Sequence, residues 1–150
     1  MKVKVLVNYH SELRLAPLVS LTDLDLQILP PQNRITADEL GRRLQGLDLD
    51  AGSNHRLVDV RSEAEFHMCR IDGAVNYPLE KFHGAKIAEV LGMVEGGDQV
   101  TFVCRRGNDS QVAANTVLDL LDDVHKSRVK DLVGGLHSWS GCVDRDFPVY

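Results

Sequence analysis

Residues 99–121, QVTFVCRRGNDSQVAANTVLDLL, decide the fold that we expect for this chain. The segment from Gln99 to Cys104 is rich in β-branched and apolar residues, which predicts a strand that ends at the cysteine. Two arginines, a glycine and an asparagine stand between Cys104 and Asp109, and residues 110–121 then follow a helical pattern. Because ligands bind at the carboxyl ends of parallel strands, Cys104 stands where a functional group is expected.

Short apolar runs alternate with helical patterns on both sides of this stretch. Thr36 is an expected helix N-cap, since Glu39 follows at the spacing of a capping box. Alternation of this kind predicts an α/β fold with a mainly parallel sheet and helices on both faces. We expect further strands at 55–60, 73–78 and 128–135, and further helices at 37–47, 79–93 and 136–143.

Residues 1–34 are less regular than the rest of the chain. The segment VKVLV (3–7) is compatible with a strand, and residues 18–29 alternate loosely until Pro30 and Pro31 interrupt the pattern. The chain of 150 residues is long enough for one domain with a sizeable core. We therefore expect one domain at 35–150, preceded at 1–34 by a linker or by the tail of an upstream domain.

Composition and charge exclude several classes of protein. The formal net charge is −5 and no basic stripe is visible, so we expect no nucleic-acid partner. No run of 18 apolar residues and no signal-peptide pattern occur in the sequence, so we expect no membrane partner. The three cysteines are odd in number, and neither C-x-x-C nor H-E-x-x-H occurs. Free thiols, no zinc site and a reducing, cytoplasmic location are the simplest interpretation.

The loop after Cys104 has the composition of an anion-binding site. Gly107 and Asn108 tolerate left-handed backbone, so the loop can turn tightly and direct its N–H groups inward. These N–H groups, the following helix N-terminus and the guanidinium groups of Arg105 and Arg106 would stabilise a thiolate. Cys104 is therefore our candidate nucleophile. The alternative is a buried cysteine that only ends a core strand.

Four segments in the same order resemble the rhodanese-like sulfurtransferases. They are LVDVR at 57–61, EAEFHMCRIDGAVNYP at 63–78, the loop from Cys104 to Asp109, and VKDLVGGLHSWSGCVDRDFPVY at 129–150. The resemblance implies a five-stranded parallel sheet. It also implies a covalent persulfide on Cys104, cradled by the backbone N–H groups of the loop that runs to Ser110.

The sequence of the loop, C-x-x-G-N-D-S-Q, and the C-terminal motif DLVGG…W…FP-Y resemble those of a narrower group of rhodanese-like domains. This group is the C-terminal rhodanese domain of the molybdopterin-synthase adenylyltransferase/sulfurtransferase family. The resemblance implies a ubiquitin-like sulfur-carrier protein as acceptor and a cysteine desulfurase or other persulfide donor. It implies roles in tRNA wobble-uridine thiolation and molybdopterin synthesis. It implies no cofactor for this domain, with ATP and zinc only in an upstream adenylation domain.

Other residues of the loop have two interpretations each. A carboxylate at Asp109 would repel thiosulfate, which predicts poor thiosulfate activity. Asp109 can also be a helix N-cap, with Ser110 sharing this role. Arg105 and Arg106 can bind the sulfur donor, favour the thiolate, or be solvated.

Outside the loop, Asp59 and Arg61 are expected to form a supporting ion pair beneath the site. We expect Cys69 and Cys142 to be packing residues, the glycines at 134–135 to form a strand-to-helix turn, and Trp139 to be a core residue.

Three alternative functions remain open at this level. A cysteine phosphatase of related fold needs Cys-x5-Arg, whereas the seventh residue counted from Cys104 is Ser110. A non-catalytic, rhodanese-like protein-binding module commonly lacks the cysteine. A thiosulfate sulfurtransferase that acts alone would need to tolerate Asp109.

Overall fold

The computed structural model describes residues 2–3, 6–9, 12–15, 19–20, 27–47 and 53–150. Its main feature is a five-stranded sheet in the order β5-β9-β8-β6-β7, and each neighbouring pair is parallel. The predicted parallel α/β fold is therefore confirmed. The strands are β5 (Arg34–Ile35), β6 (His55–Asp59), β7 (Val75–Asn76), β8 (Gln99–Val103) and β9 (Val129–Leu132).

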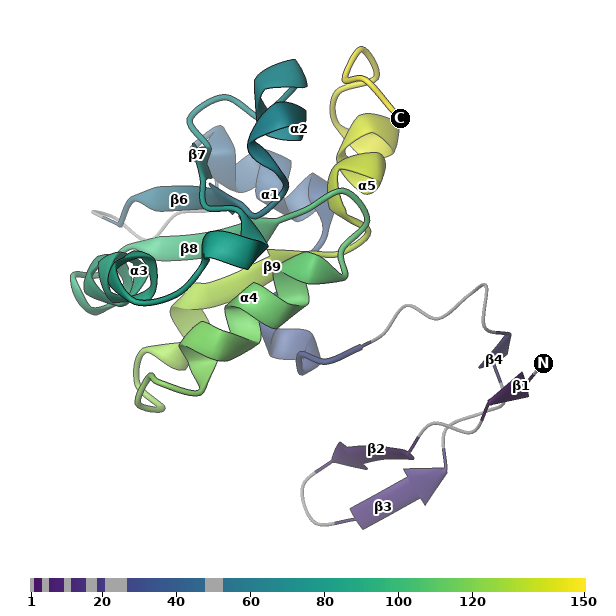
Figure 1. Cartoon of the computed structure of the whole chain (residues 1–150), viewed down its shortest axis with the longest axis vertical. Helices are drawn as coiled ribbons and strands as arrows, with labels where there is room; N and C mark the ends of the chain where they lie inside the picture. Colours follow the sequence, from purple (N-terminus) through teal and green to yellow (C-terminus); the bar gives the residue numbers. More distant parts are fainter. Residues whose placement is uncertain (1, 4–5, 10–11, 16–18, 21–26, 48–52) are drawn as a thin grey trace.

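Helices cover both faces of this sheet, as Figure 1 shows. On one face, Val58 and Phe102 pack in an apolar cluster with residues of α3 and α4. On the other face, Val103 and Trp139 share a second cluster with residues of α1 and α5, so Trp139 is a core residue as predicted. The helices are α1 (Ala37–Leu44), α2 (Glu63–Met68), α3 (Ala85–Glu95), α4 (Asp109–Leu118) and α5 (Gly135–Cys142).

Four helices differ from the sequence prediction at their ends. Helix α1 ends at Leu44, earlier than the expected 47, and α5 begins and ends one residue earlier than expected. The single helix expected over 79–93 is wrong, because a short 3-10 turn, η2 (Leu79–Lys81), precedes α3. Gly84 separates the two with a φ of 54°, a conformation that cannot continue a right-handed helix. The helix expected over 110–121 runs from Asp109 and ends at Leu118.

Helix α2 was not predicted, although its N-terminus has a strong local signal. Ser62 accepts a hydrogen bond from the backbone N–H of Glu65, and the Glu65 carboxylate accepts one from the backbone N–H of Ser62. This reciprocal capping box is the pattern expected from S-x-x-E. At α1 the predicted N-cap is confirmed, since the Thr36 hydroxyl accepts from the N–H of Glu39 at 3.3 Å.

The N-terminal part contains two short antiparallel pairs. Strand β1 (Lys2–Val3) pairs with β4 (Val19–Ser20), and β2 (Leu6–Tyr9) pairs with β3 (Glu12–Leu15). The strand expected at 3–7 includes residues 4 and 5, which lie outside the described residues. In the described part of the chain, no helix has the length and apolar character needed to cross a bilayer.

The segment before β5 packs against the sheet. Leu29 belongs to the apolar cluster on the α3–α4 face. The side-chain amide of Asn33, in the 3-10 turn η1 (Pro31–Asn33), donates to the carbonyls of Lys126 and Val129 at 2.8 and 2.9 Å. A further 3-10 turn, η3 (Lys126–Arg128), leads into β9.

Candidate active site

Cys104 directly follows β8 at the carboxyl end of the sheet, with only 3% of its surface exposed. Its sulfur is not enclosed by apolar groups alone. Sγ accepts a hydrogen bond from the backbone N–H of Gly107 at 3.0 Å, and the thiol contacts the Ser110 hydroxyl at 3.3 Å. The sulfur therefore lies inside the loop, as the nucleophile hypothesis requires, and it also ends a core strand.

The N-terminus of α5 fixes the direction of the loop backbone. The N–H groups of Leu136 and His137 donate to the carbonyls of Cys104 and Arg105 at 2.9 and 3.1 Å. A trans peptide points its C=O and its N–H in opposite directions, so the next N–H groups, those of Arg105 and Arg106, point away from α5. Among the described residues, neither of these two N–H groups donates to a backbone carbonyl. They are available to an anion or to an extra sulfur on Cys104.

Glycine is required where the loop touches the turn before α5. Gly107 has a φ of 89°, and a Cβ there would lie 2.8 Å from the backbone nitrogen of Gly134. Gly135 has a φ of 59°, and a Cβ there would lie 2.5 Å from the carbonyl oxygen of Cys104. The predicted turn at 134–135 is confirmed, and the close approach explains why two glycines form it.

A buried polar chain continues behind the sulfur. The Ser110 hydroxyl lies 3.4 Å from Oδ2 of Asp131, and Asp131 receives two hydrogen bonds from Arg34 at 2.9 and 3.1 Å. Burial raises the pKa of Asp131, while the Arg34 guanidinium opposes that change. Arg34 and Asp131 were not identified from the sequence. An acidic residue inside the apolar strand VKDLV was the available signal.

The helix that follows the loop is not capped as predicted. Asn108 occupies the N-cap position of α4 without a side-chain capping bond, and Asp109 is the first helical residue. The prediction that Asp109 is the N-cap is therefore wrong by one position. Ser110 does not share that role either, because its buried hydroxyl faces Cys104 and Asp131. A carboxylate in the first turn still interacts favourably with the helix dipole.

Asp59 and Arg61 form the buried ion pair that the sequence predicted. Nη2 of Arg61 lies 2.6 Å from Oδ2 of Asp59, and both side chains are almost fully buried. Burial disfavours the charged guanidinium, but the hydrogen bonds and charge of Asp59, together with the bonds to Tyr150 and Cys69, outweigh it and raise the pKa of Arg61 above its usual value. Arg61 also donates to the carbonyl of Cys69 at 2.6 Å and to the hydroxyl of Tyr150 at 2.7 Å.

The two loop arginines have different surroundings. The Arg105 guanidinium is half-buried and lies over the ring of Tyr150, with its Cζ 4.5 Å from the ring centroid. The Arg106 side chain is exposed. Gln111, which sequence reasoning missed, is fully buried and donates to the carbonyl of Gly107 at 2.8 Å. Its side-chain oxygen accepts from the N–H of Ile28, so Gln111 connects the loop to the segment before β5.

A cavity of about 400 Å³ lies beside the loop. Arg105 and Asp109 line it on the loop side, and Arg61, Glu65 and Glu80 line it opposite, together with Val60, Ser62, Pro78 and Leu79. Its wall is therefore partly apolar and carries charges of both signs.

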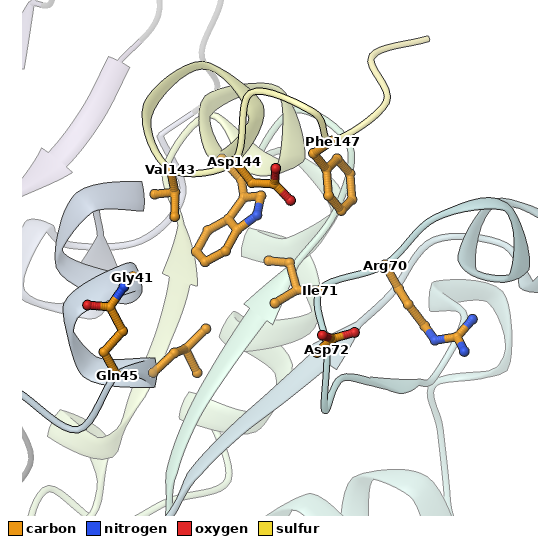
Figure 2. A pocket seen from close by; sticks show the side chains of 10 residues that line it. Gly41, Gln45, Arg70, Ile71, Asp72, Val143, Asp144 and Phe147 are labelled. Carbon is orange, nitrogen blue, oxygen red and sulfur yellow. The ribbon is translucent and has the colours of Figure 1, made fainter.

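A second cavity of about 400 Å³ lies between α1 and α5, and no loop residue lines it (Figure 2). Ile71, Trp139 and Phe147 supply apolar surface, and Arg70, Asp72 and Asp144 supply charges. The first cavity is lined by Arg105 and Asp109 of the loop, so it is the one closer to the predicted site.

The other two cysteines differ from each other. Cys69 is half-buried and packs against the cluster on the α1–α5 face, which agrees with a packing role. Cys142 is exposed at the end of α5, so the prediction that it is a packing residue is wrong. Among the described residues, no three His, Cys, Asp or Glu side chains converge as a metal site would require.

Solved structures with similar folds include two proteins of known class. One is a Saccharomyces cerevisiae homologue of single-domain rhodanese and the Cdc25 phosphatase catalytic domain, with 21% identity, a TM-score of 0.62, and coverage of 76% of this chain and 83% of that chain. The other is a rhodanese-related protein from Thermoplasma volcanium, with 21% identity, a TM-score of 0.54, and coverage of 79% and 97%. At this level of identity they show the fold alone.

Curated relatives are more similar in sequence. The adenylyltransferase and sulfurtransferase MOCS3 of Culex quinquefasciatus is 37% identical over 132 residues, and that of Drosophila grimshawi is 37% identical over 133 residues. The alignments cover 85% and 86% of this chain but only 29% and 28% of those relatives. They agree with the predicted family and support the predicted enzyme class, a sulfurtransferase. Residues 36–142 match the rhodanese-like domain family, and the chain therefore belongs to that family.

Proposed function

We propose that Cys104 carries a persulfide and passes its outer sulfur to the C-terminus of a ubiquitin-like sulfur-carrier protein. The observation that supports this most directly is the position of Sγ inside the loop, 3.0 Å from the N–H of Gly107 and 3.3 Å from the Ser110 hydroxyl. The N–H groups of Arg105 and Arg106 point away from α5, because the carbonyls of the same peptides accept from α5, and in this proposal they supply further donors. Donors that converge on sulfur stabilise its anionic forms.

The loading step is a thiol–persulfide exchange. The Cys104 thiolate attacks the outer sulfur of a persulfide on the donor, which we propose to be a cysteine desulfurase. A bond forms between Sγ and that sulfur, the donor's S–S bond breaks, and the donor leaves as a thiolate. The donor thiolate takes the proton of the transferred –SH group, so the negative charge then lies on the outer sulfur of Cys104, within reach of the loop N–H groups.

The transfer step requires an activated acceptor. In the proposed reaction, the outer sulfur attacks the acyl carbon of the adenylated carrier C-terminus, and AMP leaves. The product is an acyl disulfide, which a second thiol cleaves to release the thiocarboxylate. An upstream adenylation domain, which would use ATP and zinc, would produce the activated carboxylate. The rhodanese-like domain itself would need no cofactor. We propose tRNA wobble-uridine thiolation and molybdopterin synthesis in the cytoplasm as the setting.

Intact mass spectrometry tests the loading step. The wild-type protein is incubated with a cysteine desulfurase and cysteine, and we expect a gain of one sulfur atom per chain that a reducing thiol removes. Cys104→Ala should abolish this gain. Cys142→Ala is the matched control, because it removes an exposed cysteine far along the chain and should leave the gain intact. No gain in the wild type would instead indicate a binding module.

A further inference from the structure

Tyr150 connects the buried ion pair to the loop at the site. Its hydroxyl accepts a hydrogen bond from Nη1 of Arg61 at 2.7 Å and donates one to the carboxylate of Glu65 at 2.9 Å. Its ring lies beneath the guanidinium of Arg105, 4.5 Å from Cζ to the ring centroid. The hydroxyl and the ring therefore contact different partners, and it is the ring that contacts Arg105 of the loop.

His137 contacts the backbones of both Arg105 and Tyr150. Its N–H donates to the carbonyl of Arg105 at 3.1 Å, and its Nε2 lies 3.3 Å from the backbone oxygen of Tyr150. Tyr150 is thus held at its hydroxyl and at its backbone, which leaves its ring in a fixed place. A fixed aromatic face is a good platform for a guanidinium group.

Arg105 has hydrogen-bonding capacity that the protein does not use. Its Nε is buried, and no protein acceptor takes its proton among the described residues. The same side chain lines the cavity of about 400 Å³ beside the loop. Buried donors are normally paired, so an unpaired donor on a side chain that lines a cavity indicates a place for a ligand oxygen.

We propose that Tyr150 is a positioning residue for Arg105, which in turn binds an oxygen of the substrate next to the transferred sulfur. This inference rests on the proposed sulfur-transfer function, because it assigns a role at the same site. The ring keeps the guanidinium at the cavity and away from the carboxylates of Glu65, Glu80 and Asp109, which line the same cavity. Without the ring, one of these carboxylates could pair with Arg105 and withdraw it from the substrate.

Because the hydroxyl and the ring of Tyr150 have different partners, substitutions can separate an effect on Arg105 from an effect on stability. Tyr150→Phe removes the hydrogen bonds to Arg61 and Glu65 but keeps the ring under Arg105. Tyr150→Leu removes both. Arg105→Gln removes the guanidinium itself. A merely structural role would make the two Tyr150 variants differ in melting temperature but not in substrate recognition.

The probe is thiosulfate, a small sulfur donor with oxygens next to the transferred sulfur, with cyanide as acceptor. We expect Tyr150→Leu and Arg105→Gln to raise KM for thiosulfate about fivefold, with kcat changed less than twofold, since a lost cation–π contact of this kind weakens binding by about that factor. Tyr150→Phe should keep KM within twofold of the wild type. Combining Tyr150→Leu with Arg105→Gln should add nothing further.

Tyr77→Leu is the matched control, because Tyr77 also bonds a carboxylate through its hydroxyl and lies beneath a cation, Lys86, but does not contact Arg105. It should lower stability without changing KM. The inference is overturned if Tyr150→Leu leaves KM unchanged, or if Tyr150→Phe raises KM as much as Tyr150→Leu does. Sulfur loading by the desulfurase is measured on the same variants. A failure of the proposed function would appear as no loading in the wild type, whereas a failure of this inference alone would leave that loading intact.

Discussion

Gly135→Ala is the substitution that tests most directly how the loop is held. A Cβ at this position would lie 2.5 Å from the carbonyl oxygen of Cys104 and 2.6 Å from the carbonyl carbon of Arg105. All the atoms it meets belong to backbone, so no side chain can rotate to make room. The φ of 59° adds a conformational cost of about 1–2 kcal/mol for a residue with a side chain, and the overpacking adds about 1–3 kcal/mol.

Gly46→Ala separates these two contributions. Gly46 has a φ of 76°, and a Cβ there would meet nothing within 4 Å, so only the conformational cost of about 1–2 kcal/mol applies. We expect urea denaturation to show a loss of about 2–5 kcal/mol for Gly135→Ala and about 1–2 kcal/mol for Gly46→Ala.

The larger difference should be in chemistry. Displacing the Cys104 carbonyl turns the adjoining N–H groups away from the sulfur, so loading with a desulfurase should slow at least about 10-fold in Gly135→Ala and stay unchanged in Gly46→Ala. Equal stability losses in the two variants, together with normal loading in Gly135→Ala, would refute the view that the contact of Gly135 with the Cys104 carbonyl shapes the loop backbone around the sulfur.

Three further predictions address charge. Asp109→Thr removes a carboxylate from the cavity wall and should raise thiosulfate turnover about fivefold, whereas Asp119→Thr, at the other end of α4, should not change it; equal effects would contradict a local charge effect. Asp59→Asn leaves Arg61 buried without its carboxylate and should lower the unfolding free energy by about 3–5 kcal/mol in urea, and a loss below about 1 kcal/mol would contradict the pair's role. Burial, with the Arg43 charge, lowers the pKa of His55 to about 4, so the folded protein holds this ring neutral. The unfolding free energy should therefore fall by roughly 1–2 kcal/mol as pH drops from 6.5 toward 4, and His55→Gln should flatten that slope.

The features that were predicted from the sequence depend on local pattern. The strand before Cys104 could be identified because an apolar, β-branched run ends at a polar loop. Asp59 and Arg61 could be paired because only Val60 separates them at the end of one strand. The turn before α5 could be predicted because two adjacent glycines follow an apolar run.

The features that were missed depend on distant residues or on a single dihedral angle. Asp131 meets Arg34 across 97 positions, and Tyr150 meets Arg61 across 89, so no local pattern reports either contact. The break before α3 depends on the positive φ of Gly84, and the φ of a glycine inside an otherwise helical pattern cannot be predicted from the sequence.

The bonds from the α5 N-terminus to the loop have a consequence for how such a domain can diversify. They join main-chain atoms of Cys104 and Arg105 to the backbone of α5, so these contacts do not depend on the side chains of Arg106 and Asp109. Other side chains at these two positions would keep the same backbone contacts with α5. In this chain, evolution could therefore exchange Arg106 or Asp109 for residues suited to another donor without rebuilding the chemistry beneath them.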